Sequence, residues 1–408
     1  MPLPGETDKG YTLGTHRTVD PAETLRRVQP LLHRVGITRV ANVTGLDVIG
    51  VPVVAVVRPN SRSIAVAQGK GLDLVAAKVS GIMESLENYH AERVRQPLVL
   101  ASWEEMRARG PTLELSALPR LAGSMLDPRA PFLWTEGHEI LGRTSIWLPF
   151  ELVHTAYTVP FPTASGAFQM NDSGVAAGNH PLEATSHAIC ELVERDAVTL
   201  WEYSPRDQQQ ARKLDMRTID DVACLSVLDK FAAAGIRVGV WDVTTDSGIP
   251  VFVCMIADDP SIGQSRPLAS ATGSGCHPCR GIALMRALTE AAQTRLTVIA
   301  GSRDDLNIAT YRRGHDQTIA AEAVDMISAP GAGRSFGDGP NYAGTSFHQD
   351  VVWELERLRA IKLAQVAVVD LTLPELHIPV VRVVIPGLEG IAGSSGFAPG
   401  KRLLRRLS

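Results

Sequence analysis

Three stretches of this chain each place two oxygen-bearing side chains three residues apart. They cover residues 77–87, 184–194 and 283–293. Each contains Ala, then a small residue, then Ile or Leu, then a Glu, and a Glu or Gln three positions later. Side chains three residues apart share one face of an α-helix, and small or apolar neighbours favour a buried helix. Each stretch would therefore present one pair of oxygen ligands. The six side chains are Glu84, Glu87, Glu191, Glu194, Glu290 and Gln293.

The chemistry of these pairs follows from their oxygen atoms. Buried carboxylates require cations, and a donor set made only of oxygen suits Mg²⁺ and not zinc. A single pair of this kind is most simply a solvated pair on an exposed helix. Three copies with matching small and apolar positions favour helices that converge on hard metal ions and on the polyanion that such ions carry.

Cationic and amide side chains accompany the acidic stretches. Arg195 follows the second pair directly, Arg286 lies one turn before Glu290, and Asn179 precedes the second stretch. The planar guanidinium of arginine matches phosphate oxygens, and Lys70 lies in a Gly-Lys-Gly sequence that a phosphate could approach closely. The spacing of a P-loop and the glycine motif of dinucleotide-binding folds are both absent.

A second repeat surrounds the acidic stretches. Each copy has a β-rich run, a short polar loop, a Pro-Val step and a second β-rich run, which predicts a pair of strands with a proline at the start of the second strand. The copies cover residues 36–58, 235–256 and 365–386, with Pro52, Pro250 and Pro379.

Glycine-rich segments link the strand pairs to the acidic helices. Residues 68–71 and 272–275 are expected to be connections, and residues 173–179 precede the middle helix. The pattern predicts an α+β fold in which repeated strand pairs and helices are interleaved around one site, rather than a regular βαβ alternation.

Composition narrows the class of protein. The 408 residues are 45% hydrophobic and 21% charged, and the net charge of −4 gives no sign of nucleic-acid or membrane binding. No apolar run reaches membrane-spanning length, and the first residues lack the features of a signal peptide, so we expect a cytoplasmic protein. The five cysteines are expected to be reduced thiols; Cys276 and Cys279 form a CxxC that is read as two plain thiols, with a redox pair, half a zinc site or a sulfur carrier as alternatives.

Taken together, these motifs resemble the YcaO family. The resemblance spans nearly the whole chain, and its four ordered motifs are more specific together than any one alone. It implies a YcaO-type fold around one ATP/Mg²⁺ site, with ATP used to phosphorylate the carbonyl oxygen of a backbone amide in a peptide. The residues that carry the resemblance are 68–71 with 80–89, 174–179 with 191–197, and 286–293 with 301–305.

The resemblance also assigns roles to single residues. Five glutamates would be Mg²⁺ ligands and Gln293 would complete the last pair, while Glu191, Arg286 and Glu290 would act in catalysis. Phosphorylation would turn a poor leaving group into a good one, and the metal ions would neutralise the charge that develops on the transferred group. The residues expected at the nucleotide are Lys9, Thr15, Arg17, Lys70, Ser80, Asn179, Arg195 and Arg286.

Within the family, two features point to a subgroup. Azoline-forming members tend to end in Pro-x-Pro-x-Pro, whereas this chain ends Arg-Arg-Leu-Ser. Residues 14–17 (Gly-Thr-His-Arg) and 43–47 (Val-Thr-Gly-Leu-Asp) are more similar to members that act beside a TfuA-type protein, a subgroup associated with thioamide formation. Azoline formation from Cys, Ser or Thr of a precursor peptide and a non-catalytic ATP-binding scaffold are the alternatives.

The expected partners and domains follow from this reading. The partners would be a peptide or protein substrate, a TfuA-like protein, a sulfur donor and a second copy of the chain, with neither nucleic acid nor membrane. Residues 1–62 would be an N-terminal segment with the first strand pair, residues 63–395 the catalytic domain, and residues 396–408 a short basic tail.

Overall fold

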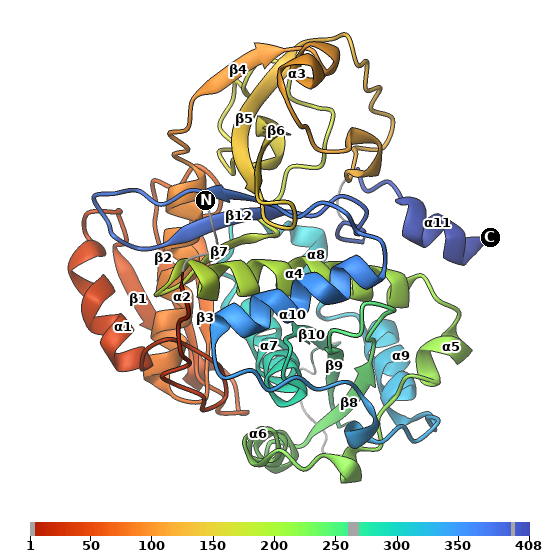
Figure 1. The fold of residues 1–408 in the computed structure, drawn as a ribbon. Helices are drawn as coiled ribbons and strands as arrows, with labels where there is room; N and C mark the ends of the chain where they lie inside the picture. The colour runs from red at the N-terminus through yellow and green to blue at the C-terminus, as the bar shows by residue number, and fades with distance from the viewer. Residues whose placement is uncertain (1–4, 260–267, 269, 393–395) are drawn as a thin grey trace. The chain divides into compact units, whose positions relative to one another are not determined.

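The computed structural model describes residues 5–259, 268, 270–392 and 396–408 (Figure 1). The chain forms two compact units, and each is assembled from segments that are far apart in the sequence. Unit 1 consists of Met1–Asp8, Leu86–Tyr203 and Gly344–Ser408, and unit 2 of Lys9–Ser85 and Ser204–Ala343. The expected division at residues 62 and 395 stays a prediction.

Unit 2 carries two three-stranded antiparallel sheets, β1-β2-β3 and β8-β9-β10. Both predicted strand pairs of this unit are confirmed, and in each the proline directly precedes the second strand. Helix α2 starts in this unit and continues past residue 85 into unit 1. The elements are α1 (Pro21–Val28), β1 (Arg39–Asn42), β2 (Val53–Val57), β3 (Val66–Lys70), α2 (Leu74–Ala91), α5 (Arg206–Gln210), α6 (Val222–Ala233), β8 (Ile236–Asp242), β9 (Val251–Asp258), β10 (Ala271–Cys276), α7 (Arg280–Ala300), α8 (Ile308–Arg313) and α9 (Gln317–Ser328).

The glycine-rich segments were expected to be connections, and this expectation is wrong. They form the third strands β3 and β10, because glycine lets the following helix lie almost on the strand backbone. A Cβ atom on Gly69 would lie 2.0 Å from the carbonyl oxygen of Ala77 in α2, and one on Gly275 would lie 2.1 Å from that of Ala283 in α7. The close packing of strand and helix thus selects residues of low β-propensity.

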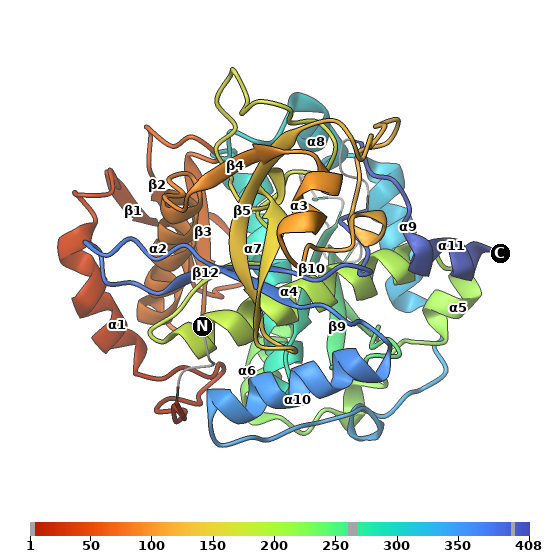
Figure 2. The same cartoon turned by 45° about the horizontal axis from the view of Figure 1, so that its top comes forward.

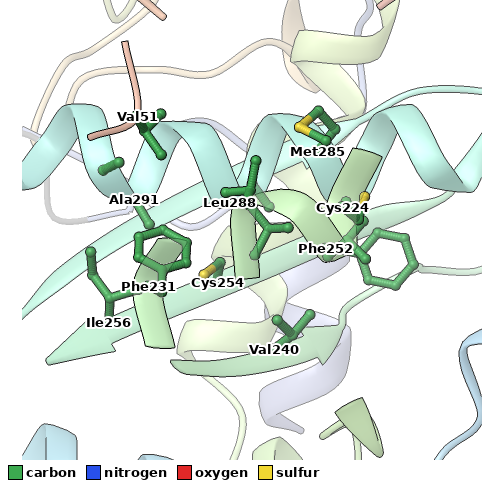
Figure 3. Packing of buried hydrophobic residues seen from close by; sticks show 14 of the residues in the cluster. Val51, Cys224, Phe231, Val240, Phe252, Cys254, Ile256, Met285, Leu288 and Ala291 are labelled. Atoms are coloured by element: carbon green, nitrogen blue, oxygen red, sulfur yellow. The ribbon is translucent and has the colours of Figure 1, made fainter. Parts of the chain in front are cut away.

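A hydrophobic core lies between α7 and the second sheet of unit 2. Figure 3 shows Leu288 and Ala291 of α7 facing Phe231 of α6 and Cys254 of β9. All four side chains are fully buried. Full burial of a side chain as large as Leu or Phe contributes about 1.5–3 kcal/mol, so this cluster fixes α7 firmly on the strands.

Unit 1 contains a six-stranded antiparallel sheet. Its strands β12 and β7 pack against helix α4, and α10 runs beside α4 (Figure 2). The elements are β4 (Leu98–Ala101), α3 (Trp103–Arg109), β5 (Phe132–Glu139), β6 (Thr144–Pro149), β7 (Val175–Ala177), α4 (Pro181–Glu202), α10 (Phe347–Ala360), β11 (Ala367–Asp370), β12 (Val380–Val384) and α11 (Lys401–Leu407).

The third predicted strand pair, β11–β12, is confirmed in unit 1, and its third strand comes from much earlier in the chain. β12 pairs with β7, which directly precedes α4. In all three sheets the valine after the proline pairs with the end of the third strand. These pairs are Val53 with Lys70, Val251 with Cys276, and Val380 with Ala177.

The three repeats also match in the helix that follows. The same number of residues separates Lys70 from Glu84, Ala177 from Glu191 and Cys276 from Glu290. Each repeat therefore combines three neighbouring antiparallel strands with an acidic helix that follows the third strand. In unit 1 the three strands, β11-β12-β7, belong to the six-stranded sheet, and their order along the chain is permuted. The α+β class expected from the sequence is confirmed, with a third strand added to each predicted strand pair.

The basic C-terminal segment ends in helix α11, which is anchored within unit 1. Leu403 is fully buried, and Glu389 accepts hydrogen bonds from the backbone of Gly400 and Leu403 at 2.7 and 2.8 Å. Among the residues that the structure describes, no helix has the length and apolar character needed to cross a membrane.

Candidate functional site

Helix α4 carries the best-defined acidic pair. Glu191 and Glu194 lie one turn apart, as predicted, and Arg195 contacts both. Its Nη2 lies 3.2 Å from Glu191 Oε1 and its Nη1 lies 3.1 Å from Glu194 Oε1. Glu194 is 5% exposed, so its carboxylate needs compensating charge. Two carboxylates share one guanidinium here, which leaves negative charge for a further cation.

The surroundings of Glu191 disfavour its ionised form. Burial raises the pKa of this carboxyl, and the nearby Asp172 and Glu194 raise it as well, while Arg195 opposes them. The backbone N–H of Gly174 donates to Glu191 Oε2 at 3.0 Å. A metal ion on this carboxylate would favour its ionised form.

Glu87, the second residue of the acidic pair of α2, contacts strand β7 within unit 1. Ala177, the last residue of β7, donates its N–H to Glu87 Oε1 at 2.8 Å. Glu84 lies three residues earlier on α2, in the part of the helix that belongs to unit 2. Asn179 lies in the short link between β7 and α4. Residues near β7 thus include one carboxylate from each of two acidic helices.

Unit 2 brings the third pair to a lysine. Lys70 Nζ lies 2.7 Å from Glu290 Oε2 and 3.0 Å from Gln293 Oε1. Gln293 Nε2 donates to the backbone oxygen of Gln68 at 2.8 Å, so β3 holds this amide at both of its polar atoms. The hydroxyl and the N–H of Ser274 both contact Glu290 Oε1, each at 3.3 Å.

The N-terminal segment adds cations to unit 2. Lys9, Arg17 and Arg286 all lie close enough to His277 to lower its pKa, after burial, which is the largest cause. Arg286 Nη1 also donates to the backbone oxygen of Cys276 at 3.3 Å. These three cations were each expected at the nucleotide, and the structure places them around one histidine.

Two expected nucleotide ligands have less defined surroundings. Thr15 lies in the same N-terminal segment as His16 and Arg17, and Ser80 lies in the first half of α2.

The predicted site residues are divided between the two units. Unit 1 holds Glu87, Asn179, Glu191, Glu194 and Arg195, and unit 2 holds Lys9, Thr15, Arg17, Lys70, Ser80, Glu84, Arg286, Glu290 and Gln293.

Sequence reasoning missed three polar groups near these residues. The rings of His16 and His277 meet edge to face at 4.9 Å, and burial lowers the pKa of His16 to about 4. Arg382 lies on β12, is 4% exposed, and is close enough to Glu191 to interact with it electrostatically. The arginine within the apolar run of β12 was a feature from which the sequence could have indicated a functional residue. The two histidines had no comparable feature.

The donor atoms fit Mg²⁺. Every side chain of the three pairs offers oxygen, and two of the pairs already contact a cationic side chain within their own unit. The ammonium group of Lys70 contacts both Glu290 and Gln293, so the oxygens of this pair already face one cationic side chain.

The sequence as a whole decides the family. A family model described as YcaO cyclodehydratase, ATP- and Mg²⁺-binding, matches residues 68–389. The chain belongs to the YcaO family. ATP and Mg²⁺, the expected cofactors, are those of the family, and the predicted membership is confirmed.

Curated relatives of this YcaO protein support the suggested subgroup. A protein of Rhizobium leguminosarum bv. trifolii, described as an uncharacterized protein in the tfuA 3′ region, is 36% identical over 91% of this chain and 88% of its own length. An uncharacterized protein of Methanothermobacter thermautotrophicus is 33% identical over 91% of this chain and 95% of its own length.

Solved structures show the same fold. A heterocyclase in complex with substrate and cofactor superposes with a TM-score of 0.80 at 21% identity, over 99% of this chain and 56% of that chain. YcaO from Methanopyrus kandleri, bound with AMPPCP and Mg²⁺, superposes with a TM-score of 0.74 at 22% identity, over 97% and 99% of the two chains.

Proposed function

We propose that this YcaO protein uses Mg²⁺ and ATP to phosphorylate a backbone amide oxygen of a peptide or protein, which releases ADP. Sulfide-level sulfur from a donor then attacks the activated carbon and expels the oxygen as phosphate, which leaves a thioamide, beside a TfuA-like partner. The single observation that carries the thioamide assignment is the relative encoded in the tfuA 3′ region. The complete set of five glutamates supports catalysis over a purely scaffolding role.

Each group of residues has a distinct task in this proposal. Glu84, Glu87, Glu191, Glu194 and Glu290, with Gln293, would hold Mg²⁺, which would neutralise charge on the transferred phosphoryl group. Arg286 would bind a phosphate oxygen with its guanidinium while its contact with the Cys276 carbonyl fixes its direction. Lys9, Thr15, Arg17, Ser80, Asn179 and Arg195 would position the nucleotide.

Calorimetric titration with AMPPCP tests the ATP site without any substrate. Binding should require Mg²⁺ and should be lost with EDTA or in Glu191→Gln. Glu202→Gln, at an exposed position of the same helix, is the matched control and should bind normally. Normal Mg²⁺-dependent binding by E191Q would contradict the ligand assignment.

Peptide mass spectrometry tests the product. In the source organism, peptides in which sulfur replaces a backbone oxygen should disappear when the gene is deleted and return with the wild-type gene but not with the E191Q gene. Peptides that have instead lost water would establish azoline formation, the alternative that fits the heterocyclase structure of the same fold.

A further inference from the structure

One side chain of unit 2 contacts both predicted metal ligands of α7. The ammonium group of Lys70 lies 2.7 Å from Glu290 Oε2 and 3.0 Å from Gln293 Oε1. These distances are those of a charge-assisted hydrogen bond and of an ordinary one. The positive charge of Lys70 therefore lies where the two oxygens of this pair converge.

The fold holds this arrangement from both sides. Lys70 ends β3, where its backbone pairs with Val53 of β2. The amide of Gln293 is bound to the backbone of Gln68, two residues before Lys70 on the same strand, and Ser274 of β10 fixes the other oxygen of Glu290. Because strand β3 and helix α7 are both anchored, the Lys70 side chain loses little conformational freedom when its ammonium group contacts the pair.

Charge sets this pair apart from the other two. The Glu84–Glu87 and Glu191–Glu194 pairs each contain two carboxylates, whereas Glu290–Gln293 contains one carboxylate and a neutral amide. The positive charge of Lys70 therefore equals in size the one formal negative charge of the third pair. Lys70 and Glu290 are 21% and 27% exposed, so the contact remains open to ions and ligands from solvent.

We propose that Lys70 is an internal cation that keeps metal ions off Glu290 and Gln293 until nucleotide arrives. The inference rests on the proposed ATP site. Ammonium and Mg²⁺ compete for the same two oxygens, so the free pair binds metal weakly. The phosphates of ATP give the displaced ammonium a new anionic partner, and the metal then enters together with the nucleotide.

Mn²⁺ titration of the nucleotide-free protein tests this inference, with the free ion counted by its electron paramagnetic resonance signal. Lys70→Met should bind Mn²⁺ about tenfold more tightly than the wild type, because the competing charge is gone. Lys70→Arg keeps the charge and should behave as the wild type does. The double variant K70M/E290Q should lose the gain.

Lys230→Met is the matched control, because Lys230 Nζ donates to the backbone oxygen of Gly50 on the surface of the same unit. Equal Mn²⁺ affinity of the wild type and K70M would overturn the inference. If K70M fails to fold, as judged by its thermal melting curve, Lys70→Gln replaces it, since an amide can still bond to Gln293.

A parallel titration with AMPPCP present separates the two proposals. A wild-type protein that binds no Mn²⁺ with AMPPCP would refute the proposed ATP site. A wild type that binds Mn²⁺ with AMPPCP, together with a K70M variant that shows no gain without nucleotide, would refute only the role of Lys70.

Discussion

Arg402 Nε in the C-terminal helix α11 lies 2.9 Å from Asp196 Oδ1 in α4. Asp196 is only 1% exposed and follows Arg195 directly, so the end of the chain is tied to the helix that carries the second acidic pair. The backbone N–H of Glu389 donates to the same oxygen at 2.9 Å. Burial nevertheless outweighs these partners and raises the pKa of Asp196 to about 6.

This ion pair predicts a pH-dependent stability. The folded state keeps the proton of Asp196 over the range from 3.8 to about 6, where the unfolded chain has released it. The free energy of unfolding should therefore fall as the pH rises through that range, by up to about 3 kcal/mol. Asp196→Asn should remove this slope in urea denaturation, and Asp229→Asn at an exposed position of α6 should keep it. Parallel curves for the wild type and D196N would contradict the prediction.

A buried ion triad in unit 2 predicts a large loss of stability. Arg295 of α7 lies 3.0 Å from both Asp47 and Asp258, and the three side chains are 3–6% exposed. Arg295→Met would leave two buried carboxylates without their cation and should cost about 3–5 kcal/mol in the free energy of unfolding.

The control for this triad is a more exposed pair of the same unit. Arg237 lies 3.1 Å from Asp259 with side chains 37% and 24% exposed. Arg237→Met should cost less than about 1 kcal/mol in the same denaturation assay, because water screens the pair. Similar losses for both variants would mean that burial does not decide the strength of these pairs.

Glycine in the third strands predicts a steric effect. Gly275→Ala should destabilise the protein by about 1–3 kcal/mol, because α7 must move away from β10 to admit the methyl group. Gly45→Ala is the matched control, because no neighbouring atom lies within 4 Å of a Cβ at this position. Thermal melting should separate the two variants, and a G275A protein as stable as G45A would contradict the close packing.

The guanidinium of Arg286 predicts a requirement for shape as well as charge. Arg286→Lys keeps the positive charge but cannot bond to a phosphate with a planar fork. We expect AMPPCP to bind about tenfold more weakly in the presence of Mg²⁺, as measured by calorimetry. Arg312→Lys, at an exposed position of α8, should bind as the wild type does.

Regular patterns in the sequence were sufficient for the acidic helices and the strand pairs. The i,i+3 spacing of Glu191 and Glu194 and the Pro-Val steps are local features. The arrangement that each predicts depends on neighbouring residues of the chain and not on distant ones. The third strands were missed because their glycines have low β-propensity, and glycine is required there only once a helix lies against the strand.

Contacts between residues far apart in the chain could not be predicted from the sequence. Lys70 and Glu290 are separated by 220 residues, and nothing in either motif indicates that they meet. The pairing of β12 with β7 was equally hidden, because β7 lies far before β12 in the sequence. The roles of these residues toward ATP and Mg²⁺ remain predictions that the experiments above address.

The permuted repeat has a consequence for synthesis on the ribosome. The sheets β1-β2-β3 and β8-β9-β10 are each contiguous in sequence, so each can form soon after its last strand emerges. Strand β7 must wait for β12, and helix α4 meanwhile exposes the apolar face that β12 will cover. The nascent chain is therefore vulnerable to aggregation through α4 until β12 has emerged.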